Sequence, residues 1–197
     1  MSHPDRRRLL AGSLATCVAL KLADEPARAE AELAPTPACG EHDEPTIRQT
    51  EGPFFKPRSP ERSDLRTGGL KGQPFELNGL VLTRKCRPVG RVLVDLWHAD
   101  DAGDYDNTGF RFRGHLYTDA QGRYRFLTIV PGVYTGRTRH FHVKVQPPGG
   151  RVLTTQLYFL DDPKNRGDGL FRRELAMKIA RAGDGLAGRF DFVLDMG

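Results

Sequence analysis

This 197-residue sequence has few cysteines, a small net charge and no long hydrophobic run. Its longest apolar stretch, residues 9–20, holds about 12 residues, whereas a helix needs about 20 to cross a bilayer, so we expect no membrane span. The formal charge of +5 is not gathered into one basic stripe, and no nucleic-acid-binding motif is present. We therefore expect no nucleic-acid partner. With 38% hydrophobic residues, the chain can bury the core of one domain.

The N-terminus has the features of an export signal. Three arginines, Arg6 to Arg8, precede the apolar run, and Ala27-Arg28-Ala29 fits a small-x-small cleavage site. The arginines followed by Leu9 and Leu10 also resemble a twin-arginine signal, which predicts a periplasmic or extracellular protein. The predicted parts are an export signal over 1–29, an extended lead-in over 30–48 and one domain over 49–197.

The three cysteines are distributed unevenly between the predicted parts. Cys17 falls inside the signal, which leaves Cys39 and Cys86 in the mature chain. An even pair in an oxidising compartment predicts a Cys39–Cys86 disulfide, while two free thiols remain the alternative.

Short runs rich in β-branched and aromatic residues recur along the chain, separated by Gly- and Pro-rich turns. This spacing predicts an all-β fold, an antiparallel β-sandwich of the immunoglobulin or prealbumin kind with long loops. A helical pattern near 170–182 predicts one short C-terminal helix. The predicted strands are 75–83, 90–97, 113–117, 123–129, 140–146, 152–159 and 189–195.

The stretch YTGRTRHFH, residues 134–142, holds the most informative pair of side chains. On a strand, His140 and His142 point to one face and are close enough to bind one ion, while Phe141 points to the core. A solvated polar face is the alternative. Further ligands could come from His98 and His115, which would make a three-histidine zinc site, or from tyrosines.

Tyrosine ligands would indicate a particular metal. A phenol has a pKa of about 10, so a strongly acidic cation is needed to displace its proton. Ferric iron suits anionic oxygen and also binds imidazole. Two phenolates and two imidazoles would leave a formal charge of about +1 on the site, which suits a dianionic catecholate.

Four stretches together resemble the intradiol ring-cleavage dioxygenase family, especially the protocatechuate 3,4-dioxygenase core. The match covers about residues 49–160 in the family's order. The stretches are QTEGPFF at 49–55, VDLWHADDAGDY at 94–105, YTDAQGRYRFLTIVPGVYTGRTRHFHVKV at 117–145, and LTTQLYF at 153–159.

The resemblance implies a non-haem Fe(III) site and assigns a role to each matching position. The implied iron ligands are Tyr105, Tyr134, His140 and His142. Tyr134, Arg137 and Gln156 are the implied catalytic residues. Thr50, Gly52 and Pro53, together with Arg137, are implied to bind substrate, and His98 and His115 fall at structural positions.

The implied activity is cleavage of a catechol-type ring between its two hydroxylated carbons, with dioxygen as the other substrate and a muconate-type diacid as the product. Catechol, substituted catechols, protocatechuate and hydroxyquinol all remain open as substrates, with Arg113 or Arg139 as candidates to bind a ring carboxylate. The alternatives are a non-catalytic module that binds aromatic or carbohydrate ligands, and a zinc hydrolase. The oligomeric state is open, and nothing in the sequence indicates a homo-oligomer.

Overall fold

The computed structural model describes residues 44–66 and 71–197, and the fold of this part is nearly all β. The predicted export signal, most of the lead-in and Cys39 lie outside the described residues, so the disulfide with Cys86 stays a prediction. The strands are β1 (Pro74–Thr83), β2 (Leu93–Trp97), β3 (Arg113–Tyr117), β4 (Arg123–Ile129), β5 (His140–Gln146), β6 (Leu153–Phe159), β7 (Ala176–Ala182), β8 (Gly185–Arg189) and β9 (Phe192–Leu194), and the 3-10 helices are η1 (Pro163–Gly167) and η2 (Arg173–Leu175).

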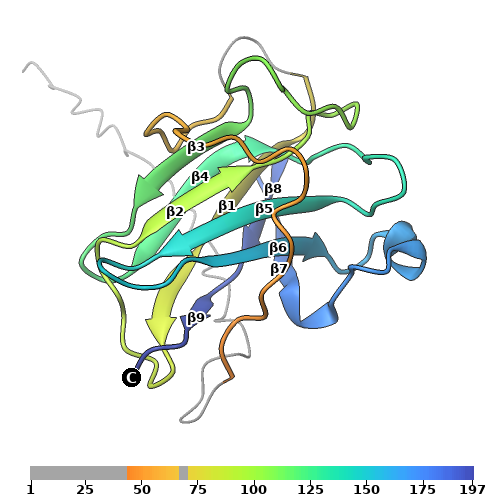
Figure 1. Ribbon diagram of the computed structural model, residues 1–197. Coiled ribbons are helices and arrows are strands. Elements are labelled where there is room, and N and C mark those ends of the chain that lie inside the picture. Colours follow the sequence, from red (N-terminus) through yellow and green to blue (C-terminus); the bar gives the residue numbers. More distant parts are fainter. Residues whose placement is uncertain (1–43, 67–70) are drawn as a thin grey trace, which may run out of the picture. The chain divides into compact units, whose positions relative to one another are not determined.

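The strands form a two-layer sandwich, which confirms the predicted fold class (Figure 1). One layer is ordered β3-β2-β5-β6 and the other β8-β1-β4, and β7 joins them. The ring of Phe75 on β1 lies 5.3 Å from that of Phe141 on β5 and 5.4 Å from that of Phe159 on β6. The hydrophobic core therefore lies between the layers, built from the alternate residues of each strand that face inward.

The sheet is mixed, whereas the sequence predicted an antiparallel sandwich. Strand β1 pairs in parallel with β8 and with β9, and β6 pairs in parallel with β7. The other pairs are antiparallel. Parallel neighbours need long connections, and the segment after β6, with η1 and η2, is one of them.

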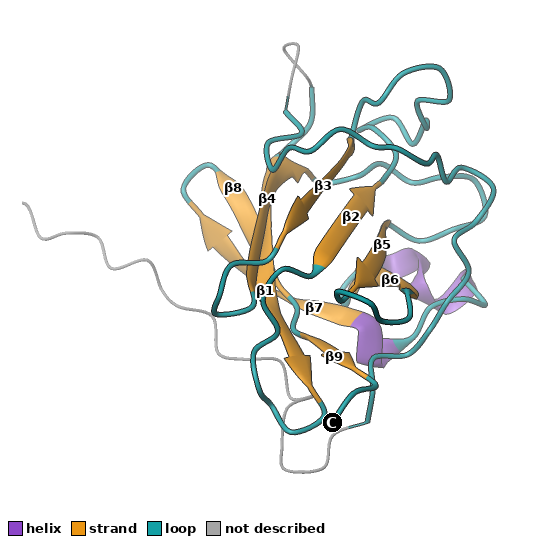
Figure 2. Ribbon diagram, turned by 60° about the vertical axis from the view of Figure 1, so that its left-hand side comes forward, coloured by secondary structure: helices purple, strands orange, loops and turns teal. Residues whose placement is uncertain are grey.

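The predicted helix near 170–182 is wrong. This region forms η2 and then strand β7, which pairs with β6 and β8 (Figure 2). The apolar residues Leu170 and Ile179 suggested a helical face, yet both are exposed. The buried residues are Leu175 and Met177, two apart, as expected for a strand. Tertiary pairing thus overrides the local helical pattern.

A short segment before β1 covers the edges of both layers. Arg62 N donates to His115 O on β3, and Leu65 N donates to Leu127 O on β4, each as part of a short backbone bridge. Leu65 is fully buried between the layers. Covering the edges satisfies their free backbone groups and blocks edge-to-edge aggregation.

The chain before this segment runs along the sheet and over the outer face of the first layer. Thr46 N donates to Val193 O on β9, and Gln49 N donates to Thr154 O on β6. Figure 1 draws this segment in orange, in front of β5 and β6. Within residues 44–66 and 71–197, no helix combines the length and hydropathy that a membrane crossing requires.

Candidate metal centre

Two histidines of β5 point away from the core, as the alternation of the strand predicted. Phe141 and Val143 belong to the core cluster between the layers, so His140 and His142 project to the outer face. Both are nevertheless buried, with 4% and 3% of their surface exposed. A solvated polar face is therefore excluded, because loops and the segment near Thr50 cover these rings.

Three donor atoms converge at this place. Tyr105 Oη lies 3.3 Å from His140 Nε2 and 3.1 Å from His142 Nε2, and the two Nε2 atoms are 3.1 Å apart. Two donors bound at about 2.1 Å to one ion, at near-tetrahedral or right angles, would lie about 3.0–3.4 Å apart. The spacing of the three atoms thus fits ligands of a single metal ion.

Both imidazoles are in the state that a metal requires. Burial lowers the pKa of His140 to about 4 and holds that of His142 well below its usual range, so both rings are neutral at neutral pH. His140 Nδ1 donates to the carbonyl oxygen of Thr138 at 2.7 Å. This bond fixes the tautomer and leaves the Nε2 lone pair free for an ion.

Tyr105 sits in a loop after β2 that the carboxylate of Asp100 organises. Asp100 Oδ1 accepts from the backbone N–H groups of Ala102 and Asp104. Asp100 O accepts from Gly132 N at 2.7 Å, which ties this loop to the one that carries Tyr134. Burial raises the pKa of the Tyr105 phenol, so a strongly acidic cation is needed to displace its proton.

Tyr134 lies beside this group, although its hydroxyl has no hydrogen-bond partner among the described residues. The Tyr134 ring stands edge-on to that of Tyr105, with the centroids 5.8 Å apart, and edge-on to that of Phe54 at 5.3 Å. The structure thus brings all four predicted ligand residues together, three of them by their donor atoms and Tyr134 by its ring.

Arg137 and Gln156 form a polar network next to the histidines. Arg137 Nη2 donates to Gln156 Oε1 at 2.6 Å, and Arg137 Nε donates to Asp168 Oδ2 at 2.8 Å. The Tyr158 hydroxyl donates to Gln156 Oε1 at 3.0 Å. Gln156 is opposite His142 in the β5–β6 register, which explains how the network reaches the donor atoms.

The predicted substrate-binding segment covers the site from the other side. Gln156 Nε2 donates to Thr50 O at 2.9 Å, and a Cβ atom on Gly52 would stand 3.2 Å from His142 Cε1. Pro53 follows and is exposed. The ring of Phe54 then stacks on that of Tyr105, with the centroids 4.4 Å apart. This segment therefore lies against two of the predicted ligands.

The other two candidate histidines lie elsewhere. His98 packs edge-on against Phe141 on the core side of β5, and its two ring nitrogens bond to Ala99 O and Thr128 Oγ1, each at 2.7 Å. His115 Nδ1 bonds to Ser59 Oγ at 3.1 Å. Across residues 44–66 and 71–197, no cluster of three or more His, Cys, Asp or Glu side chains could hold a metal ion. The three-histidine zinc arrangement is therefore absent from this part.

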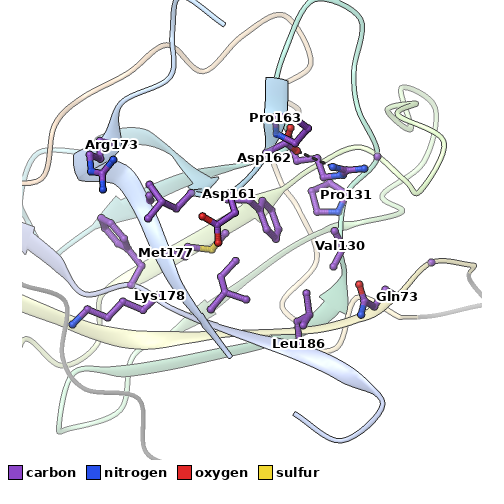
Figure 3. A pocket seen from close by; sticks show the side chains of 18 of the residues that line it. Gln73, Val130, Pro131, Asp161, Asp162, Pro163, Arg173, Met177, Lys178 and Leu186 are labelled. Carbon is purple, nitrogen blue, oxygen red and sulfur yellow. Dashed lines mark hydrogen bonds and ion pairs between the residues drawn. The ribbon is translucent and has the colours of Figure 1, made fainter. Parts of the chain in front are cut away.

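A large cleft opens at another place. It has a volume of about 1210 Å³ and is lined by apolar residues such as Met177 and Leu186, as Figure 3 shows. None of the predicted catalytic or metal-ligating residues lines it. Arg139 does, and its Nη1 forms an ion pair with Asp162 Oδ2 at 2.8 Å. Arg139 therefore pairs with Asp162 at the cleft, and it is not among the side chains whose donor atoms converge.

Sequence reasoning gave no role to several residues that support the site. Asp168 anchors Arg137, and Trp97 stacks on the His142 ring, with the centroids 4.9 Å and the planes 7° apart. The sequence contained a signal for Trp97, because it occupies an alternate position of a strand whose other face is apolar. No local pattern marked Asp168, which lies in an irregular loop.

The donor set fits Fe(III) better than zinc. Neutral imidazoles bind either metal. The proton of a buried phenol, however, is displaced most readily by a hard, highly charged cation. The two histidines and two tyrosines gathered on the outer face of this β-sandwich would together hold one metal ion. The comparisons with known proteins show the family to which the chain belongs.

The family model described as dioxygenase matches residues 50–196. Catechol 1,2-dioxygenase 2 of Acinetobacter lwoffii is 32% identical over 144 residues, which are 60% of this chain and 52% of that protein. Hydroxyquinol 1,2-dioxygenase of Rhodococcus opacus is 32% identical over 146 residues, 61% of this chain and 48% of that protein. The chain belongs to the intradiol ring-cleavage dioxygenase family, and it spans about half the length of these two curated relatives.

A solved structure is more similar still. The dioxygenase domain of a dioxygenase carbohydrate-binding protein fusion from the cellulolytic bacterium Streptomyces sp. SirexAA-E is 53% identical, with a TM-score of 0.77. The match covers 78% of this chain and all of that domain.

Proposed function

We propose that the protein is a non-haem Fe(III) dioxygenase that cleaves catechol-type rings between the two hydroxylated carbons. The observation that carries this proposal is the convergence of Tyr105 Oη, His140 Nε2 and His142 Nε2 within 3.1–3.3 Å of one another. With Tyr134 as the fourth ligand, these residues would hold the iron. Both atoms of dioxygen enter the muconate-type product, so no external reductant is needed.

Bound Fe(III) would supply the Lewis acidity that draws electron density from a catecholate and prepares it for dioxygen. The protein supplies the proton transfers and the positioning. The phenolate oxygen of Tyr134 accepts a proton from a catechol hydroxyl, and the Tyr134 ring lies in a loop beside Tyr105. Phe54, stacked on Tyr105, provides an apolar surface for the substrate ring.

Arg137 stabilises the negative charge that develops on the substrate during ring cleavage. Its guanidinium is held by Asp168 and Gln156, so it needs no reorganisation when the charge appears. Gln156 orients the ring, and Thr50 O in turn accepts from its amide. This set of contacts joins the predicted substrate segment to the predicted catalytic residues.

Two other functions are less well supported. A zinc hydrolase would need His98 or His115 beside the histidine pair, and both are bonded elsewhere. A binding module that has lost turnover would not need the network of Arg137 and Gln156, which this chain retains. The substrate itself is left open among catechol, substituted catechols, protocatechuate and hydroxyquinol.

The visible absorption spectrum of the iron-loaded protein tests the proposal. We expect a broad tyrosinate-to-Fe(III) band that shifts when catechol is added without oxygen, and oxygen uptake with catechol in air. Tyr134→Phe should retain iron and lose most of the turnover. A colourless protein at full iron occupancy would contradict the tyrosinate ligands, and unchanged turnover in Tyr134→Phe would contradict its role as a base.

We also propose that the chain is exported by the twin-arginine route, on the evidence of Arg6, Arg7 and the apolar run that follows. That route carries folded proteins, so the iron could be inserted before export. Cell fractionation of the full chain tests this, with Arg6→Lys and Arg7→Lys combined as the variant. Protein found only in the cytoplasm would reject export, and unchanged export of the variant would reject the twin-arginine route.

A further inference from the structure

Arg113 on β3 carries a buried positive charge beside the candidate metal centre. Only 2% of its surface is exposed. Its Nε donates to Asp106 O at 3.1 Å and its Nη1 donates to Phe54 O at 2.7 Å. Its Nη2 has no partner, and it forms no ion pair, among the described residues. Asp106 and Asp95 act on this charge from beyond ion-pair distance, so no carboxylate of the described residues is bonded to the buried guanidinium. Burial of a guanidinium without a bonded carboxylate is costly.

The two carbonyl groups that Arg113 binds belong to residues that adjoin Tyr105. Asp106 is the next residue in the chain, and the Phe54 ring is stacked on the Tyr105 ring at an angle of 15°. One rigid, forked side chain therefore holds both the loop that carries Tyr105 and the ring that packs on it. Arg113 lies on a strand, whereas Tyr105 and Phe54 lie in irregular segments. The hydrogen bonds of Arg113 therefore tie these two segments to a rigid part of the sheet.

Arg113 also belongs to a row of side chains that crosses the outer face of the first layer. The register places Arg113 opposite Trp97, Trp97 opposite His142 and His142 opposite Gln156. Of the four buried side-chain atoms without a partner in the described part, three belong to this row: Arg113 Nη2, Trp97 Nε1 and His142 Nδ1. Buried polar atoms without a partner are uncommon, so three of them in the row that contains His142 set this row apart from the rest of the described part.

We propose that Arg113 is a positioning residue for Tyr105: it holds the backbone of the next residue and of the residue whose ring stacks on Tyr105, and its buried positive charge acts on the metal-bound phenolate. This inference rests on the proposed function, because the phenolate exists only with the metal. It also gives β3, which contributes no predicted ligand, a part in building the site.

Two substitutions separate the two parts of the proposed role. Arg113→Lys keeps the charge and loses the fork, whereas Arg113→Gln keeps donor atoms and loses the charge. The matched controls are Arg125→Lys and Arg125→Gln on β4, where the arginine forms a largely exposed ion pair with Glu76. Each full-length protein is loaded with iron, and three quantities are measured: the visible band, the rate of iron release to a chelator, and the circular dichroism spectrum.

We expect both Arg113 variants to fold and to release iron about 10-fold faster than the wild type, as is usual when a group behind a metal ligand is changed. Arg113→Gln should also shift the tyrosinate band, and Arg113→Lys should restore its position in part. The Arg125 variants should match the wild type. Wild-type band and release rate in both Arg113 variants would overturn the inference, and so would loss of fold in both, which would make the role structural. A wild type without a tyrosinate band would instead reject the proposed function.

Discussion

A Cβ atom on Gly52 would stand 3.2 Å from Cε1 of His142, so the backbone of the substrate segment lies directly against a predicted iron ligand. Gly52 also has a φ of +69°, in the left-handed region that favours glycine. The close approach and the backbone conformation together explain why glycine occupies this position. They also link the placement of the segment to the placement of the His142 ring.

Gly52→Ala is therefore expected to displace His142 and weaken iron binding about 10-fold or more. Iron release to a chelator measures this effect. Gly149→Ala is the matched control, because Gly149 has a φ of +67° and its Cβ would meet nothing within 4 Å. Both substitutions strain the backbone, but only the first adds a contact with His142. Equal iron retention in the two variants would mean that the contact between residue 52 and His142 does not affect iron binding.

Asp168 is expected to act on catalysis through Arg137. Its Oδ2 accepts from Arg137 Nε at 2.8 Å and from Thr138 N at 2.9 Å. Asp168→Asn removes the negative charge that pairs with Arg137 and should lower kcat about 10- to 100-fold, since small displacements of a positioned group are costly. The visible band should persist, because Asp168 contacts no predicted ligand side chain.

The control for this prediction is Asp162→Asn. Asp162 is also buried, and its carboxylate likewise pairs with an arginine, Arg139, and accepts from a backbone N–H. Arg139 lies at the cleft, away from the converging donors. Steady-state oxygen uptake with catechol compares the two variants. If both lose the same activity, the effect of Asp168 comes from loop stability and not from Arg137.

Two buried histidines with different surroundings should respond differently to the same substitution. His142→Asn removes one of the converging nitrogens, so the protein should lose its bound iron and its visible band. His98→Asn breaks a bond to Thr128 in the core and should lower the free energy of unfolding by about 1–3 kcal/mol while iron is retained. Metal analysis and urea unfolding measure the two effects, and iron loss in His98→Asn would revive a role for His98 as a ligand.

The sequence predicted much of this fold because most strands alternate clearly. Three predicted strands, 113–117, 123–129 and 140–146, have the bounds observed for β3, β4 and β5. Strand β8 was not predicted, since Gly185–Arg189 contains two glycines and no β-branched residue. It forms because β1 and β7 lie on either side of it and supply its backbone partners. Propensity alone could not show this.

The candidate site was predictable where chemistry-bearing residues recur in a recognisable pattern, as at His140 and His142. The supporting contacts were not predictable, because they depend on distances between segments far apart in the chain. Asp168 reaches Arg137 across 31 positions, and Arg113 reaches Phe54 O across 59. Only the packed fold brings such groups within hydrogen-bond distance, so the spacing of residues in the sequence does not predict these contacts.

The segment that covers the sheet edges should contribute strongly to stability through Leu65. This side chain is fully buried between the layers, the N–H of Leu65 donates to Leu127 O, and Ser63 O accepts from Leu127 N. Leu65→Ala should lower the free energy of unfolding by about 2–5 kcal/mol, because it leaves a cavity that the two rigid sheets cannot fill. Urea unfolding measures the change.

Leu160→Ala serves as the control. Leu160 is 40% exposed, so its loss should change the free energy of unfolding by no more than about 0.5 kcal/mol. Iron binding should be unchanged in both variants, since Leu65 lies on the core side and the donors lie on the outer face. A loss of iron in Leu65→Ala at temperatures where the protein remains folded would show that the edge segment also shapes the metal centre.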